Sequence, residues 1–304
     1  MHKKLNRLIE NAARIILGKE SQIRMAVCCI LARGHLLIED IPGVGKTTLS
    51  HTLARLLGLH FQRIQFTSDL LPADILGANV FDARNHRFQF HPGPIFNEMV
   101  LADEINRSPP KAQSALLEAM EERQVTVDGE THALPKPFFV IATQNPNEQI
   151  GTFPLPESQL DRFLMKIDLG YPNREAERAL LQGADRHSMI ETLPVCLPPE
   201  DLLDAQSMVC DIHASDALLD YLQSILDFSR STSEYQLGLS PRAGLALLHA
   251  SKARVFLDGR DSVLPEDLQT VLAAVAGHRL RTSETGNRSS VSVVAPILEQ
   301  VAIP

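Results

Sequence analysis

The order of apolar and polar residues divides the chain into two parts. In the first part, five short apolar runs alternate with helical patterns, and these runs begin at His35, Phe61, Met99, Phe138 and Phe163. Short buried strands separated by helices are typical of a parallel sheet covered by helices. The pattern therefore predicts an α/β domain over residues 1–170.

Beyond residue 170 the pattern changes to long helices. The clearest helical stretches cover residues 174–184, 216–231, 241–257 and 265–276. Their apolar residues recur at the spacing of one helix face. We expect a second, all-helical domain over residues 171–304.

Two segments interrupt the α/β pattern and are expected to form β-hairpins. Residues 79–93 alternate around a polar tip, and residues 123–134 turn at Asp128-Gly129. An Asp-Gly pair between alternating residues is a strong hairpin signal. Insertions of this kind on a sheet domain often carry function.

Composition limits the class of protein. Of the 304 residues, 44% are hydrophobic, and no run approaches the roughly 18 apolar residues that a membrane span needs. The first residues carry charges where a signal peptide is apolar. We expect a cytoplasmic protein with no membrane span. The formal net charge of -8 argues against a surface that binds duplex phosphates.

A phosphate-binding loop follows the first apolar run. Residues 38–50 read IEDIPGVGKTTLS, which fits G-x-x-x-x-G-K-[ST] except that Asp40 replaces the first glycine. Gly43 and Gly45 allow backbone N–H groups to approach phosphates, and Lys46 supplies a charge to the outer ones. The expected ATP-contacting residues of this loop are Pro42, Gly43, Val44, Gly45, Lys46, Thr47 and Thr48.

Two adjacent acids end the third apolar run, in MVLADEINRS. Asp103 can hold Mg²⁺ together with the Thr47 hydroxyl, and Glu104 can take a proton from an attacking water. Such a pair is common in ordinary loops. In combination with Lys46 and Thr47, it indicates hydrolysis of Mg-ATP.

The fourth apolar run ends in IATQNP. Asn145 lies where it can orient the attacking water between the two elements. An asparagine before a proline is equally favoured in a plain turn, and local sequence leaves both interpretations open.

Taken together, these stretches resemble the MoxR branch of the AAA+ ATPases. The resemblance rests on LLIEDIPGVGKTTL, VLADEINRSPPKAQSALLEAMEERQVTVDG, FFVIATQNPNEQIGTFPLPESQLDRFLMKIDLGYP and LSPRAGLALLHASKARVFLDGR, and it extends to GHRL at 277 and the terminal ILEQVAIP. In that family an aspartate is often found at the position of Asp40. The resemblance implies a P-loop AAA+ core with two inserted hairpins, followed by an all-α lid.

The resemblance also implies roles for further residues. Asn145 would be the first sensor, Arg162 the arginine finger that acts on a neighbouring subunit's γ-phosphate, and Arg242 the second sensor on the lid. Gly18, with Ile16 and Leu17, would lie against the adenine. The arginine-finger role requires a homo-oligomer, normally a hexameric ring.

Each arginine has another interpretation from local sequence. Arg162 could open the last strand as a surface residue, Arg107 could be the interface arginine instead, and Arg242 could pair with an acid on its own lid. The family resemblance favours Arg162 and Arg242.

Proteins of this kind are typically ATP-driven chaperones that remodel, assemble or activate partners, in some cases by inserting a metal cofactor. They often work with a protein that carries a von Willebrand factor A domain. A chelatase motor subunit and a nucleic-acid motor are the alternatives. The tip at residues 84–87 is basic, but the acidic chain and the lack of an aromatic stacking platform favour a solvated or protein-contacting tip over nucleic acid.

Overall fold

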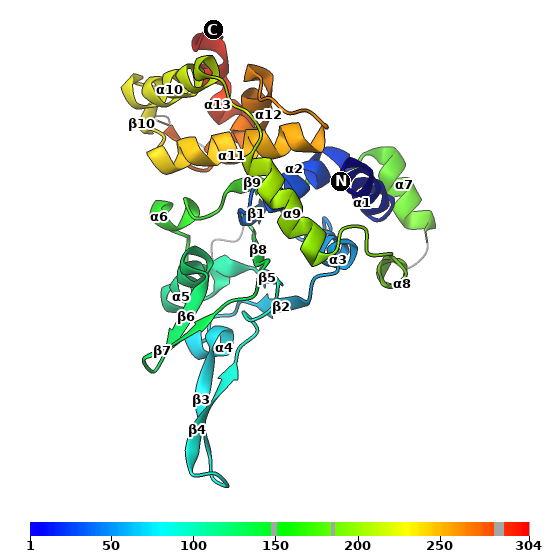
Figure 1. The fold of residues 1–304 in the computed structure, drawn as a ribbon, viewed down its shortest axis with the longest axis vertical. Coiled ribbons are helices and arrows are strands. Elements are labelled where there is room, and N and C mark those ends of the chain that lie inside the picture. The colour runs from blue at the N-terminus through cyan, green and yellow to red at the C-terminus, as the bar shows by residue number, and fades with distance from the viewer. Residues whose placement is uncertain (147–150, 184–185, 283–288, 304) are drawn as a thin grey trace.

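A five-stranded parallel sheet forms the centre of the molecule (Figure 1). The computed structural model describes residues 1–146, 151–183, 186–282 and 289–303. The strands are β1 (Leu36–Glu39), β2 (Phe61–Gln65), β5 (Met99–Asp103), β8 (Phe139–Gln144) and β9 (Met165–Ile167). Each contains part of one predicted apolar run, so the α/β prediction is confirmed.

The strands lie in the order β2-β5-β8-β1-β9, and both faces of the sheet are covered. Leu36 and Ile38 pack into one hydrophobic cluster and Leu37 into another, as alternation along a strand requires. The first cluster contains residues of α1 (His2–Ile15), α2 (Glu20–Leu31) and α3 (Lys46–Leu57). The second contains residues of α5 (Pro110–Glu122). Three short helices, α4 (Pro72–Leu76), η1 (Ile105–Arg107) and α6 (Glu157–Leu160), complete this part.

Both predicted hairpins are present. One consists of β3 (Gly77–Asp82) and β4 (Arg87–Pro92), the other of β6 (Gln124–Val127) and β7 (Glu130–Ala133). The two touch, because the Phe90 and His132 rings stack with centroids 3.9 Å apart. The β3–β4 hairpin projects from the body at the end opposite α10 and α13 (Figure 1).

The β3–β4 hairpin carries an exposed aromatic pair. Phe81 and Phe88 face each other across the strands, with ring centroids 5.4 Å apart, and they are 51% and 70% exposed. The sequence alone predicts no aromatic platform here. That expectation was wrong, because the strand register brings together two rings that are seven positions apart in the sequence.

The second part of the chain is helical, as predicted. Its helices are α7 (Arg174–Gln182), α8 (Arg186–Glu191), α9 (Pro199–Cys210), α10 (Asp216–Ser231), α11 (Pro241–Leu257), α12 (Pro265–Ala276) and α13 (Ser290–Gln300). Asn173, Ser215 and Ser240 cap α7, α10 and α11 through their side chains, which fixes where these helices begin. A short ribbon of β10 (Tyr235–Leu237) and β11 (Arg281–Thr282) was not predicted. No helix in the described ranges is both long and apolar enough to cross a membrane.

Candidate nucleotide-binding site

The loop between β1 and α3 has the backbone that a phosphate site needs. Gly43 and Gly45 have φ angles of +84° and +97°, which side chains other than hydrogen disfavour. A Cβ added at either position would meet no protein atom within 4 Å, so conformation and not crowding requires these glycines. Gly45 is also the N-cap of α3, and no side chain caps this helix end. The first N–H groups of α3 can therefore bind an anion.

Lys46 and Thr47 begin α3 beside this loop. The Lys46 ammonium donates a hydrogen bond to the Asp40 carbonyl oxygen at 2.6 Å. Its partial burial lowers the pKa of Lys46, and the neighbouring carboxylates of Asp40, Asp103 and Glu104 act in the opposite direction. Thr47 is exposed in the first turn. An ammonium, a hydroxyl and nearby acids are groups that fit a triphosphate with Mg²⁺.

Asp40 explains how the loop differs from the general pattern. The residue is 9% exposed, and one carboxylate oxygen accepts hydrogen bonds from the N–H groups of Leu169 at 2.7 Å and Gly170 at 2.5 Å. The other oxygen accepts from the Ile41 N–H at 2.8 Å. Asp40 thus fastens the phosphate loop to the chain that leaves β9. A glycine would leave these N–H groups without this acceptor.

Asp103 is the last residue of β5 and Glu104 follows it, and the Thr143 hydroxyl bonds both residues. The Thr143 hydroxyl donates to the Asp103 carboxylate at 2.5 Å and accepts from the Glu104 N–H at 2.9 Å. Glu104 itself has φ +57° and ψ +49°, a left-handed conformation that is uncommon outside glycine. Such conformations gather at functional sites.

Strand β2 supplies partners for both acids. Arg63 donates to the Asp103 carboxylate at 2.6 Å, and the Gln65 amide donates to Glu104 at 2.8 Å. Arg63 also donates to the Gln65 amide oxygen at 2.7 Å. Arg63, Gln65 and Thr143 were not predicted as site residues from the sequence. The available signal was two polar residues on either side of the buried Ile64 at the end of a strand.

The structure places Asn145 after the strand next to β5, and Gly18 in the turn after α1. Asn145 directly follows β8, which lies between β1 and β5, and its carbonyl accepts from the Asn106 amide at 3.4 Å. Gly18 ends the turn after α1, with φ +69°, and an added Cβ would lie 3.1 Å from that of Ala176. The neighbouring Lys19 ammonium donates to the Tyr171 carbonyl at 2.7 Å. The chain after β9 thus links this turn to the phosphate loop.

Arg162 lies at the opposite edge of the sheet. Leu36 pairs with Met165, so the chain before β9 lies beside the start of β1, whereas Lys46 follows the end of β1. Strand β1 has four residues and is roughly 13 Å long. Arg162 is therefore separated from its own subunit's phosphate loop by the length of this strand.

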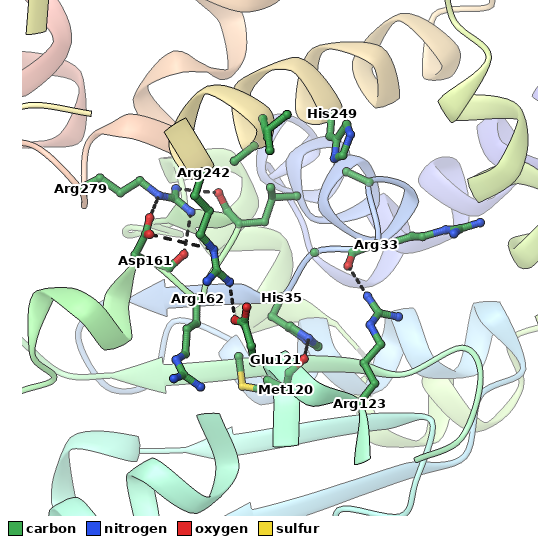
Figure 2. A pocket seen from close by; sticks show the side chains of 15 residues that line it. Arg33, His35, Met120, Glu121, Arg123, Asp161, Arg162, Arg242, His249 and Arg279 are labelled. Atoms are coloured by element: carbon green, nitrogen blue, oxygen red, sulfur yellow. Dashed lines mark hydrogen bonds and ion pairs between the residues drawn. The ribbon is translucent and has the colours of Figure 1, made fainter. Parts of the chain in front are cut away.

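Arg242 joins Arg162 at this second edge, where both line a cavity of about 240 Å³ (Figure 2). The charged residues of the cavity are five arginines and two acids, namely Arg33, Arg123, Arg162, Arg242, Arg279, Glu121 and Asp161. Arg242 donates to Glu121 at 2.5 Å, and Arg162 donates to the Leu117 carbonyl at 2.7 Å. Glu121 belongs to α5 of the core, so the main acidic partner of Arg242 is not on its own lid.

His35 also lines the cavity but has no acid–base role there. Its Nδ1 accepts from the Val140 N–H at 2.9 Å, which requires a neutral ring with its proton on Nε2. Nε2 can then donate to the Met120 carbonyl, which lies 3.3 Å away. Complete burial lowers the pKa of His35 to about 3. The ring is therefore a neutral packing residue.

Comparisons with known proteins support the fold and identify the family. Residues 35–165 match the ATPase family associated with various cellular activities, and residues 228–297 match an AAA lid domain. A crystal structure of a candidate ATPase from Cytophaga hutchinsonii superimposes with a TM-score of 0.91 at 36% identity, covering 100% of this chain and 96% of that one.

Three curated relatives cover most of the chain. The uncharacterized protein YeaC of Bacillus subtilis is 43% identical over 100% of this chain and 96% of its own. Chaperone MoxR1 of Mycobacterium tuberculosis is 39% identical over 99% of this chain and 82% of its own. Protein MoxR of Paracoccus denitrificans is 32% identical over 88% of this chain and 85% of its own. The chain therefore belongs to the MoxR family of AAA+ ATPases.

Proposed function

We propose that the protein hydrolyses Mg-ATP in a hexameric ring of identical subunits, with each site shared between two neighbours. The observation that supports this proposal is that two groups of candidate residues lie at opposite ends of the strands. The phosphate loop and the two acids lie at one edge, which we call the nucleotide edge. Arg162 and Arg242 lie at the other, which we call the arginine edge. In a ring, the nucleotide edge of each subunit would lie against the arginine edge of the next subunit, and this contact would complete the site.

At the nucleotide edge, the chain would bind Mg-ATP and activate the attacking water. The glycine loop and Lys46 would hold the phosphates, and Thr47 and Asp103 would hold Mg²⁺, which supplies charge neutralisation when bound. Glu104 would take the proton from the attacking water, and Asn145 would orient that water. Residues 1–170 form this nucleotide-binding unit in our proposal.

At the arginine edge, Arg162 and Arg242 would stabilise the charge that develops on the neighbour's γ-phosphate. Arg242 comes from the lid, residues 171–304, and Arg162 from the core. Lid and core would therefore act on the same neighbouring site, and Arg242 would act in trans.

Hydrolysis would drive the remodelling or activation of a partner protein in the cytoplasm. The name of the relative Chaperone MoxR1 supports a chaperone role. The partner we propose carries a von Willebrand factor A domain, and insertion of a metal cofactor is one form that activation could take.

A nucleic-acid motor is the second candidate, and one observation favours it. The exposed Phe81 and Phe88 rings lie beside the exposed Arg84 and Arg87 on the β3–β4 hairpin. Bases stack on such rings, and arginines attract the phosphate backbone. The acidic chain weighs against this candidate.

Two experiments test the proposal. If sites are completed in trans, specific ATPase activity should rise with protein concentration, and Arg162→Ala should abolish hydrolysis while leaving nucleotide binding. Activity that is independent of dilution and that persists in Arg162→Ala would contradict the shared site. To find the partner, a tagged Glu104→Gln variant, which should bind Mg-ATP without hydrolysing it, is recovered from lysate of the source organism. Lys46→Ala is the control. A protein enriched only with Glu104→Gln supports the chaperone role, whereas enriched nucleic acid supports the second candidate.

A further inference from the structure

One lid residue holds the chain that carries Arg162. Arg279 follows α12, and its side chain is only 5% exposed. Its Nε donates to the Asp161 carboxylate at 2.6 Å, and Nη2 donates to the Asp161 and Phe163 carbonyls at 3.1 and 2.6 Å. Nη1 donates to the Leu164 carbonyl at 3.1 Å. The carbonyls on both sides of Arg162 are thus bound by a single guanidinium.

Only an arginine can make this set of bonds. All three nitrogens of Arg279 donate, and Nη1 also donates to the Val275 carbonyl of α12. A guanidinium offers five N–H groups in a planar fork, whereas a lysine offers three from one point. The adjacent His278 reinforces the contact, with Nε2 3.1 Å from the Phe163 carbonyl.

The same chain segment is fixed from the other side by β1. The Leu164 N–H donates to the His35 carbonyl at 2.9 Å. A Cβ added at Gly34 would lie 2.2 Å from that of Leu164, so the two backbones approach as closely as a glycine allows. The segment therefore has β1 on one side and the lid on the other.

Asp161 extends the contact to the second arginine. One oxygen of its carboxylate accepts from Arg279, and the other lies 4.0 Å from Nε of Arg242 (Figure 2). Arg242 is held in addition by Glu121. Asp161 thus lies between the two arginines of the lid, next to Arg162 in the chain.

We propose that Arg279 is a positioning residue that ties the lid to the segment 161–164, so that Arg162 and Arg242 are presented to the neighbouring subunit as one unit. The inference rests on the proposed function, since it assigns Arg279 to the arginine edge. It gives a role to the His278-Arg279 pair of the GHRL stretch. Arg279 itself does not contact nucleotide in this role.

The first test separates positioning from nucleotide binding. Arg279→Ala should bind a fluorescent ATP analogue like the unaltered protein but turn over about 100-fold more slowly, because small displacements of catalytic groups cost that much. Arg279→Lys, which keeps the ion pair with Asp161, should recover part of this loss. Arg281→Ala removes an exposed neighbour that bonds Glu157 at 3.2 Å and should behave normally. Normal turnover in Arg279→Ala would overturn the inference.

The second test uses mixed rings. Lys46→Ala has a disabled nucleotide edge and an intact arginine edge, so mixing it with Arg279→Ala should restore activity at about a quarter of the interfaces. Mixing Arg279→Ala with Arg162→Ala should restore nothing, because both defects lie at the same edge. If Arg162→Ala is rescued by Lys46→Ala but Arg279→Ala is not, the inference fails and the proposed function stands. If neither is rescued, the proposed function fails and the inference with it. Arg279→Lys serves in the same mixtures if the alanine variant does not fold.

Discussion

The two edges of the sheet are built in different ways. The nucleotide edge takes its main groups from loops that directly follow β1, β5 and β8. Each of these residues therefore lies next to the end of a strand in the sequence as well as in space. The arginine edge gathers side chains from separate places in the chain, with Arg33, Arg123, Arg162, Arg242 and Arg279 on five segments. The nucleotide edge is thus formed by residues next to strand ends, whereas the arginine edge is formed by tertiary packing.

The difference in charge is as clear as the difference in construction. Asp103 and Glu104 mark the nucleotide edge, whereas arginines outnumber acids at the arginine edge. Hydrolysis of a triphosphate needs both acidic groups for metal and water and cations for the transition state. One subunit holds the two acids at one edge, together with Lys46 and Arg63, and the five arginines of the cavity at the other. In the proposed function, the two edges meet between neighbouring subunits.

The largest effects should come from disabling the nucleotide edge. Lys46→Ala should abolish nucleotide binding, whereas Glu104→Gln should keep binding and lower turnover by about 1,000-fold or more, because the group that takes the proton is lost. Binding of a fluorescent ATP analogue and phosphate release measure the two steps separately. A Glu104→Gln variant that still turned over at the normal rate would assign the base to another residue.

Asp40 tests whether the nucleotide edge depends on its link to β9. Asp40→Gly restores the general loop pattern but leaves the Leu169 and Gly170 N–H groups without this acceptor, at a cost of about 3 kcal/mol in the free energy of unfolding. Urea denaturation measures this cost. Asp40→Asn retains one acceptor oxygen and should lose less. Equal stability of Asp40→Gly and the unaltered chain would show that the carboxylate is dispensable.

The arginine edge should carry a pH dependence of folding through His35. The unfolded ring takes up a proton near its ordinary pKa of 6.5, but burial lowers the folded pKa to about 3. Stability is therefore intact above pH 6.5 and should fall by about 1.4 kcal/mol per pH unit as pH decreases toward 3. The buried His278, whose pKa is also lowered by burial, adds to the slope.

Denaturation curves between pH 8 and pH 5 measure this effect. His35→Gln should reduce the slope even if it lowers stability at pH 8, since its amide does not titrate. An unchanged slope in His35→Gln would exclude His35 as the titrating group.

The smallest effect should come from Arg63. Its guanidinium is half-exposed and bonds the Asp103 carboxylate, which is the expected Mg²⁺ ligand. Arg63→Ala removes a competing positive charge, so half-maximal ATPase activity should need a few-fold less Mg²⁺. Titration of Mg²⁺ at fixed ATP measures the change. A higher requirement would mean that Arg63 assists the metal site and does not compete with it.

Local sequence was sufficient for the nucleotide edge and for most of the fold. The five strands, both hairpins and helices such as 216–231 follow from patterns whose residues are close in the chain. Lys46, Asp103 and Glu104 could be predicted to lie together because strand ends of a parallel sheet share one edge. The family resemblance indicated only that an aspartate is common at the position of Asp40. Its hydrogen bonds could not be predicted, because its partners Leu169 and Gly170 are far along the chain.

The remaining residues could not be predicted, because their contacts depend on tertiary structure. Thr143 looks like any residue of a buried strand, and only the neighbouring β5 reveals that its hydroxyl bonds Asp103 and Glu104. The Phe81–Phe88 pair depends on hairpin register, and Arg279 depends on how the lid packs against the core. Local sequence could not distinguish these residues from ordinary surface or core positions.

The central claim is that one active site requires two subunits, and mixed rings of Lys46→Ala and Arg162→Ala test it most directly. Each variant alone should be inactive, the first because its nucleotide edge is disabled and the second because its arginine edge is. Mixed in equal amounts, they should regain ATPase activity, since some interfaces join an intact nucleotide edge to an intact arginine edge. A mixture as inactive as its components, with ring formation confirmed by analytical ultracentrifugation, would contradict the division of the site between neighbours.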